Sequence, residues 1–376
     1  MSDHGVYVHV PWCRARCPYC AFAVVPGAAP PDWRPYVAKV LAEAASWAPA
    51  FPGRGATLYL GGGTPSRLPV AAIAALVAGL GAGWDEVTVE CNPEDAAPAW
   101  LDGVVAAGVT RISLGVQSTV PAVARRLGRG HTQAHAAASM ARVAASGVRS
   151  WSADLMFAVP GQALGDLDRD LDALLEAGVP HVSLYGLTFE PGTRFDAARQ
   201  RARGGVTPVD DDLWRAMYDR IVERLHGAGI RRYEVSNFAR PGHEARHNAG
   251  YWADRPYLGL GPSAHGYAPD GTRWVNRADL ADWLAADDPT ASRERPDPWT
   301  RAVDRLVSGV RAAAGLELGA LGVPVDDREV ERLVTLGAIV RTGDRIALTD
   351  AGFPICDAVV GRLVDALQAE PPVDPA

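Results

Sequence analysis

The sequence has no run of about 18 consecutive apolar residues, so it offers no candidate transmembrane helix. Its first residues, MSDHGVYVHVPWC, also lack the basic segment and long apolar stretch of a secretory signal. Positive charge is not in excess, because 37 Lys and Arg stand against 44 Asp and Glu. We therefore expect a cytoplasmic protein with neither a membrane span nor a nucleic-acid-binding surface.

Cysteine is scarce, with five residues in a chain of 376. Cys13, Cys17 and Cys20 fall within one short segment, while Cys91 and Cys356 stand alone. A disulfide framework needs paired cysteines in a small secreted chain, so this distribution argues against one. It favours a metal site in a reducing compartment, with Cys91 and Cys356 as small hydrophobic residues.

Short runs rich in Val, Ile, Leu and Tyr alternate with amphipathic stretches through the first half of the chain. The pattern predicts strands at 6–10, 57–61, 86–91, 111–116, 150–157 and 181–187, and helices at 32–47, 69–80, 98–107, 132–145 and 163–177. Six βα units in series predict an α/β fold with a parallel sheet and helices outside it. We prefer a partial, TIM-like (βα)6 barrel, and a flat doubly wound sheet is the alternative.

The pattern changes after about residue 237. Residues 1–237 are assigned to the barrel, and residues 238–290, where Gly, Pro, His and aromatic residues are frequent, to a cap or connecting segment. Residues 291–376 carry two helix signals followed by the hairpin-like GAIVRTGDRIALTD, which predicts a small α+β, winged-helix-like domain. Because the chain is acidic, we do not interpret this domain as DNA-binding.

The cysteine triplet has the spacing C-x3-C-x2-C and follows the first predicted strand. Thiolates are soft ligands that suit zinc or an iron–sulfur cluster. A four-iron cluster held by three cysteines keeps one iron open for chemistry. Zinc would need a fourth ligand at similar spacing, and only His9, inside the strand, is near.

Polar residues also stand where later strands end. Gly61, Gly62 and Gly63 end one strand and permit a tight turn close to a ligand. Glu90 with Asn92, then Gln117, then Asp154 lie on the following strands. Each of these residues alone could be a helix cap or a buried polar residue whose hydrogen bonds are made within the core. However, the carboxyl ends of parallel strands meet at one edge of the sheet. Together they predict one site.

The segments VYVHVPWCRARCPYC, GGGTPS, VECNPE, RISLGVQS, LGRGH and DLMFAVPGQ resemble, in this order, the HemN/HemW branch of the radical S-adenosylmethionine (SAM) superfamily. The resemblance implies a [4Fe–4S] cluster held by Cys13, Cys17 and Cys20. It also implies SAM on the open iron, cleaved to methionine and a 5′-deoxyadenosyl radical. Matched by position, the branch's SAM contacts fall on Tyr7, Gly62, Gly63, Thr64, Glu90, Gln117, Arg129 and Asp154. Arg129 suits this role, because a guanidinium can pair with the SAM carboxylate.

Two classes of protein share this branch: a decarboxylating oxygen-independent coproporphyrinogen III oxidase and a haem chaperone. Three features favour the chaperone. Phe22 occupies the position of the oxidase's further cysteine, only 12 residues precede Cys13, and His247 begins the segment HNAGYW that resembles the chaperone's His-Asn-x-x-Tyr-Trp. Haem is then the cargo, acceptor haemoproteins and an electron donor are the partners, and His247 is the expected haem ligand, with His265 a weaker candidate.

One position departs from the chaperone pattern, since Ala21 replaces the aspartate that usually follows the third cysteine. A third function therefore remains open beside the oxidase. HemN-like methyltransferases or cyclopropanases use a second SAM as a methyl source, and the sequence does not separate them from the chaperone.

Overall fold

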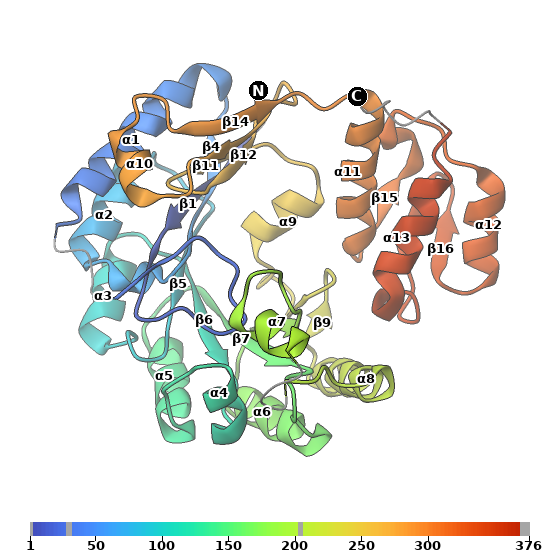
Figure 1. Ribbon diagram of the computed structural model, residues 1–376, viewed down its shortest axis with the longest axis horizontal. Helices are drawn as coiled ribbons and strands as arrows, with labels where there is room; N and C mark the ends of the chain where they lie inside the picture. The colour runs from blue at the N-terminus through green and yellow to red at the C-terminus, as the bar shows by residue number, and fades with distance from the viewer. Residues whose placement is uncertain (1–2, 28–31, 202–205, 369–376) are drawn as a thin grey trace.

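The computed structural model describes residues 3–27, 32–201 and 206–368. Its centre is six parallel strands that lie side by side in chain order (Figure 1). They are β1 (His4–Val10), β4 (Gly55–Gly62), β5 (Glu86–Cys91), β6 (Arg111–Gln117), β7 (Ser150–Phe157) and β8 (His181–Gly186). The expected α/β fold with its parallel sheet is confirmed.

The helices that connect these strands lie in an arc along the outer side of the sheet (Figure 1). They are α1 (Arg34–Trp47), α2 (Val70–Gly79), α3 (Pro98–Ala106), α4 (Pro121–Arg126), α5 (Gln133–Ala145) and α6 (Leu164–Glu176). Two further helices, α7 (Arg194–Gln200) and α8 (Asp211–Gly227), follow β8. Helices along one side of a curved sheet are the arrangement of a barrel, whereas a doubly wound sheet carries helices on both faces. The strand order ends at β14 and β9 without joining them, so the barrel is partial.

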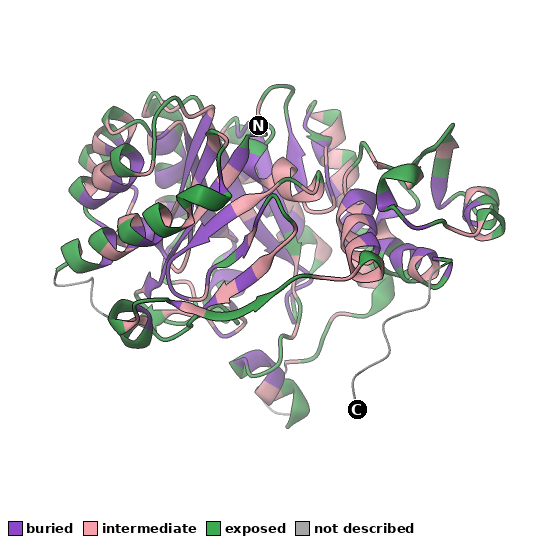
Figure 2. Ribbon diagram, turned by 90° about the horizontal axis from the view of Figure 1, so that it is seen from above, coloured by how far each residue is buried: buried purple, intermediate pink, exposed green. Residues whose placement is uncertain are grey.

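Alternation along the strands separates an apolar outer face from a polar inner face. Leu58, Val87, Ile112 and their counterparts on the neighbouring strands are buried in the main hydrophobic core. Figure 2 shows the strands of the sheet largely in the colour of buried residues. The opposite set faces the interior of the barrel and includes Tyr59, Thr88, Glu90, Arg111, Ser113 and Asp154. The interior is therefore built to hold polar groups.

Short strands between residues 231 and 294 extend both edges of this sheet. At one edge β11 (Tyr257–Leu260) pairs in parallel with β1, and β12 (His265–Tyr267), β13 (Arg273–Asn276) and β14 (Thr290–Glu294) follow antiparallel. At the other edge are β10 (Asn237–Ala239) and β9 (Arg231–Arg232). Strands this short, among Gly and Pro, give no readable periodicity, so their pairing depends on the edges that β1 and β8 offer. In chain order, the helix α9 (Arg246–Trp252) follows β10 and the helix α10 (Leu280–Ala285) follows β13.

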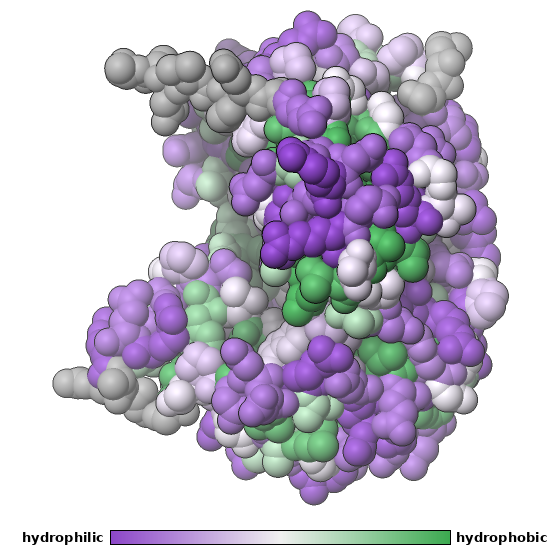
Figure 3. Space-filling model, turned by 90° about the vertical axis from the view of Figure 1, so that its right-hand side faces the viewer, coloured by the Kyte–Doolittle hydropathy of each residue, from purple (hydrophilic) through white to green (hydrophobic). Residues whose placement is uncertain are grey.

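The end of the chain forms a small α+β unit beside the barrel, at the right of Figure 1. It contains α11 (Pro298–Arg311), α12 (Asp327–Thr335), α13 (Cys356–Asp365) and an antiparallel sheet of β15 (Leu316–Glu317), β17 (Arg345–Leu348) and β16 (Ile339–Thr342). Arg232 of the barrel joins the two parts, because its guanidinium pairs with Asp350 and lies 3.7 Å from the centre of the Phe353 ring. The side that carries this unit is mainly hydrophilic with smaller apolar patches (Figure 3).

Short 3-10 helices at Ala48–Ala50, Pro65–Arg67, Leu318–Leu321 and Phe353–Ile355 complete the described elements, with β2 (Trp12–Cys13) and β3 (Val25–Pro26). Across the described ranges, no helix is both long and apolar enough to cross a membrane.

Candidate functional site

A cavity of about 900 Å³ opens at the carboxyl ends of the parallel strands and reaches into the barrel. It brings together most of the residues that the sequence singled out. Its lining includes Cys13, Cys17, Cys20, Gly62, Gly63, Thr64, Glu90, Asn92, Gln117, Arg129 and Asp154. Tyr7 and His247 are not among its lining residues. Their roles, like those of the lining residues, remain predictions.

The cysteine loop is closed at its base by the parallel pair β2 and β3. Within it the Cys20 amide donates to the Cys17 carbonyl at 3.2 Å, and the Cys13 sulfur lies 3.3 Å from the Thr64 hydroxyl. A Cβ on Gly128 would lie 2.9 Å from the Pro18 ring, so glycine lets the LGRGH segment lie against the loop. The three thiols thus stand at the mouth of the cavity, held by neighbouring strands and turns.

The donor set fits a cluster that keeps one position open. Burial raises the pKa of Cys13 and Cys20, so the free thiols are protonated and iron would have to displace those protons. Within the described residues, no three His, Cys, Asp or Glu side chains are arranged around a single metal ion. A four-iron cluster takes each thiolate on a different iron, which lets its ligands stand farther apart. The cavity beside the thiols leaves room for a further ligand.

The glycines at the end of β4 allow β1 and β4 to approach closely. Gly62 has φ 107°, a left-handed conformation that side chains disfavour, and its amide donates to the Glu90 carboxylate at 3.0 Å. A Cβ on Gly63 would lie 2.8 Å from the Val10 carbonyl oxygen, which no real contact tolerates. The two glycines therefore place backbone, not side chains, at the cavity wall.

Glu90 lies inside the barrel and accepts a second bond from the Tyr59 hydroxyl at 2.9 Å. Burial, with repulsion from Asp154, raises the pKa of Glu90 to about 7.

Tyr7 packs on the Tyr59 ring with centroids 6.1 Å apart and shares a 3.1 Å hydrogen bond with His9. Tyr59, which the sequence analysis did not single out, lines the cavity although Tyr7 does not. The sequence does hold a clue to Tyr59, because it alternates with the apolar Leu58 and Leu60 on the strand that leads directly into the three glycines.

Replacing Glu90 with glutamine is expected to flatten the pH dependence of stability. A carboxyl whose pKa is about 7 when folded and 4.5 when unfolded binds its proton more tightly in the folded chain. The free energy of unfolding then falls as pH rises from 4.5 to 7. Glutamine can still accept from the Gly62 amide and donate to the Tyr59 hydroxyl, but it does not titrate. The free energy of unfolding of Glu90→Gln should therefore decrease less over this pH range than that of wild type. Urea unfolding of the cluster-free chain across this range measures it, with the exposed Glu331→Gln as control. An identical slope in Glu90→Gln and wild type would contradict the assignment.

Arg129, Asn92 and Gln117 gather above Gly115 of β6. The Arg129 guanidinium donates to the Asn92 side-chain oxygen at 2.8 Å, and a Cβ on Gly115 would lie 3.3 Å from both Asn92 and Gln117. Among the described residues, the Arg129 Nε has no partner. Gln117 has φ 65°, a strained conformation for a residue with a side chain, which surrounding contacts must hold in place.

The turn after Gln117 is fixed by a buried carboxylate. Asp170 of α6 accepts from the Ser118 hydroxyl at 2.9 Å and from the Thr119 hydroxyl at 2.7 Å. Deeper in the barrel, Asp154 accepts from Ser113 at 3.0 Å, and burial raises the pKa of Asp154. The Asp154 charge is thus stabilised by hydroxyl donors rather than by a direct ion pair.

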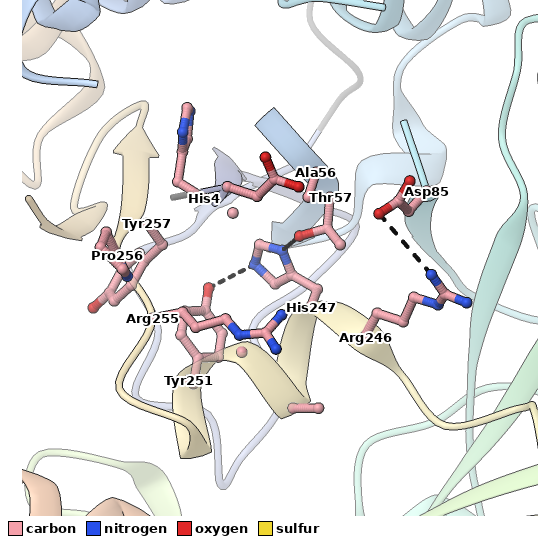
Figure 4. A pocket seen from close by; sticks show the side chains of 14 residues that line it. His4, Ala56, Thr57, Asp85, Arg246, His247, Tyr251, Arg255, Pro256 and Tyr257 are labelled. Carbon is pink, nitrogen blue, oxygen red and sulfur yellow. Dashed lines mark hydrogen bonds and ion pairs between the residues drawn. The ribbon is translucent and has the colours of Figure 1, made fainter. Parts of the chain in front are cut away.

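His247 lies in a separate pocket of about 300 Å³ at the opposite ends of the strands (Figure 4). Its Nδ1 lies 2.8 Å from the Thr57 hydroxyl and its Nε2 lies 2.8 Å from the Tyr251 hydroxyl. Burial lowers the pKa of His247 to about 3, so the ring is neutral. Both ring nitrogens are engaged, and iron ligation would require one of these bonds to break. Asn248, the next residue, lines the cavity of the cysteines instead.

The comparisons with known proteins agree with this architecture. A sequence model of the radical SAM superfamily matches residues 7–174. The "Heme chaperone HemW" of Mycobacterium tuberculosis H37Rv is 39% identical over 374 residues, which cover 96% of this chain and 94% of that protein. That of Escherichia coli K12 is 37% identical over 277 residues, 71% of each chain. The solved coproporphyrinogen III oxidase HemN of Escherichia coli has a TM-score of 0.80 at 20% identity, covering 96% of this chain and 90% of that one, and shows the shared fold alone.

The chain carries a radical SAM domain over residues 7–174, and its fold is the one seen in the solved HemN structure. Membership of this superfamily implies a [4Fe–4S] cluster and SAM as cofactors. Within the superfamily the chain belongs to the HemW family of the HemN/HemW branch, as the resemblance predicted.

Proposed function

We propose that this chain binds haem and passes it to acceptor haemoproteins. The supporting observation is the similarity to the HemW haem chaperone of Mycobacterium tuberculosis, which extends over 96% of this chain. Phe22 agrees with it, because the further cysteine expected of the oxidase is missing from that position. An electron donor for the cluster completes the expected partners, and the expected location is the cytoplasm.

The cavity is the proposed site of the cofactors. Cys13, Cys17 and Cys20 would hold the cluster, which supplies the electron that cleaves SAM. Arg129 would orient the SAM carboxylate through charge-assisted hydrogen bonds, since its side chain lines the cavity and Asn92 holds its guanidinium in place. The backbone at Gly62 and Gly63, with Thr64, Glu90, Gln117 and Asp154, would hold the rest of SAM. Tyr7 would act from behind Tyr59, by fixing its ring.

Anaerobic titration of the cluster-loaded protein with haem tests the proposal, alongside a coproporphyrinogen III decarboxylation assay on the same preparation. We expect saturable haem absorption bands and no protoporphyrinogen. Efficient decarboxylation with little specific haem binding would contradict the proposal and favour the oxidase. Methyl transfer from a second SAM would favour the third function.

His247→Ala is expected to reduce haem binding while cluster and SAM binding persist, because the cavity residues are untouched. A variant of one hydrogen-bond partner of His247 provides a matched comparison with His247→Ala. Tyr251→Phe removes the bond to Nε2 and frees that nitrogen for iron, so its haem affinity should equal or exceed that of wild type. Haem titration of both variants measures this, with thermal unfolding to register lost stability. If His247→Ala binds haem as wild type does, the histidine is a structural residue and not the ligand.

A further inference from the structure

The cavity continues below the predicted SAM residues to a polar floor. Thr88, Arg111 and Asn248 line this floor, and none of them has an assigned role. Arg111 and Gly115 face the same side of β6, because both line the cavity and they are four positions apart along the strand. At about 3.3 Å per residue, Arg111 lies about 13 Å farther down the barrel than the Gly115 position beneath Arg129.

Arg111 is a buried cation without a direct partner. Only 3% of the residue is exposed, and neither Nε nor Nη1 has a hydrogen-bond acceptor among the described residues. A guanidinium always carries its charge in proteins, and burying one unpaired is costly. The charge is felt nearby, since burial and Arg111 together lower the pKa of His181.

The surrounding carboxylates are already engaged by other donors. Asp154 accepts from Ser113 at 3.0 Å. Glu86 accepts from the backbone amides of α9 at 3.0 and 3.1 Å, and Glu234 accepts from the Ser236 amide at 2.9 Å. Arg111 therefore keeps donors without acceptors at the wall of the cavity, which Asn248 of α9 also lines.

We propose that Arg111, assisted by Asn248, binds a carboxylate of the molecule that fills the lower part of the cavity, and that this carboxylate is a tetrapyrrole propionate. The inference rests on the proposed haem-binding function but not on the assignment of His247, which lies in the separate pocket. The mouth of the cavity supports it, because Phe22 is 62% exposed and Tyr185 43% exposed, with Met156 between mouth and floor. Apolar side chains in the wall of the cavity, together with a cation deeper in it, match an apolar macrocycle that carries carboxylates.

The test compares haem with haem dimethyl ester, in which both propionates are esterified. Cluster-loaded wild type should bind haem at least about tenfold more tightly than the ester, since a hydrogen-bonded charge pair contributes about one factor of ten or more. Arg111→Gln should remove this preference, and Arg111→Lys should keep part of it because the charge remains. Arg149→Gln, at an exposed position, removes the same charge outside the cavity and should leave the preference unchanged. An undiminished preference in Arg111→Gln would overturn the proposal.

A second arm uses sodium propionate alone against sodium chloride at equal ionic strength. Propionate should raise the melting temperature of wild type and of Arg111→Lys, but not that of Arg111→Gln. This arm distinguishes the possible failures. If wild type binds no haem, the proposed function fails, while the propionate response still decides whether Arg111 is a carboxylate site. Stabilisation by propionate without any preference for haem over its ester would assign the site to a small free carboxylate and overturn the tetrapyrrole assignment.

Discussion

Replacing Cys13, Cys17 and Cys20 with alanine is expected to abolish iron binding. All three thiols stand at one cavity, and thiolates are the ligands on which the cluster depends. Anaerobic reconstitution followed by iron analysis and Mössbauer spectroscopy measures the loss, and wild type should show a [4Fe–4S] signal. Cys356→Ala is the matched control, because this buried thiol lies in the C-terminal unit and its loss should leave iron content unchanged. Iron retained in the triple variant, or zinc alone in wild type, would contradict the cluster assignment.

Arg129→Ala is expected to weaken SAM binding by about 1.5–3 kcal/mol, or roughly tenfold to a hundredfold. The guanidinium is held by Asn92 and Arg129 lines the cavity, so its removal leaves the SAM carboxylate without its cationic partner. Equilibrium dialysis of SAM on cluster-loaded protein measures the change.

Arg142→Ala controls for the loss of charge. Arg142 lies on α5 and donates to the Ala96 carbonyl at 2.7 Å, outside the cavity lining. Its replacement should leave SAM affinity unchanged. Equal SAM affinity in wild type and Arg129→Ala would remove Arg129 from the proposed SAM site.

The parallel core could be predicted from sequence because its strands are continuous and buried. The predicted ranges 86–91 and 150–157 match β5 and β7, and the polar residues at their ends meet in one cavity as the rule for parallel strands requires. The strands β11 to β14 could not be predicted in this way. They have three to five residues each, and their existence depends on the free edge of β1.

The interior of the site shows a second limit of sequence. Tyr7 and Tyr59 lie directly opposite each other on paired strands, and sequence alone does not decide which ring lines the cavity. Arg111 stands at the first position of β6, where an arginine is typical of an exposed strand end. Only the curvature of the sheet around it turns this residue into a buried cation. His247 was assigned through a motif, and the motif does not reveal that Thr57 and Tyr251 bind its ring.

The most direct test of haem delivery is transfer from the loaded protein to an apo-haemoprotein. Haem-loaded, cluster-containing protein is mixed anaerobically with apo-acceptor, the two are separated, and the haem absorption of each is recorded. The proposed function predicts that haem moves to the acceptor faster in the presence of this protein than from free haem in solution. Haem that stays on the protein, or transfer no faster than from free haem, would contradict the chaperone function.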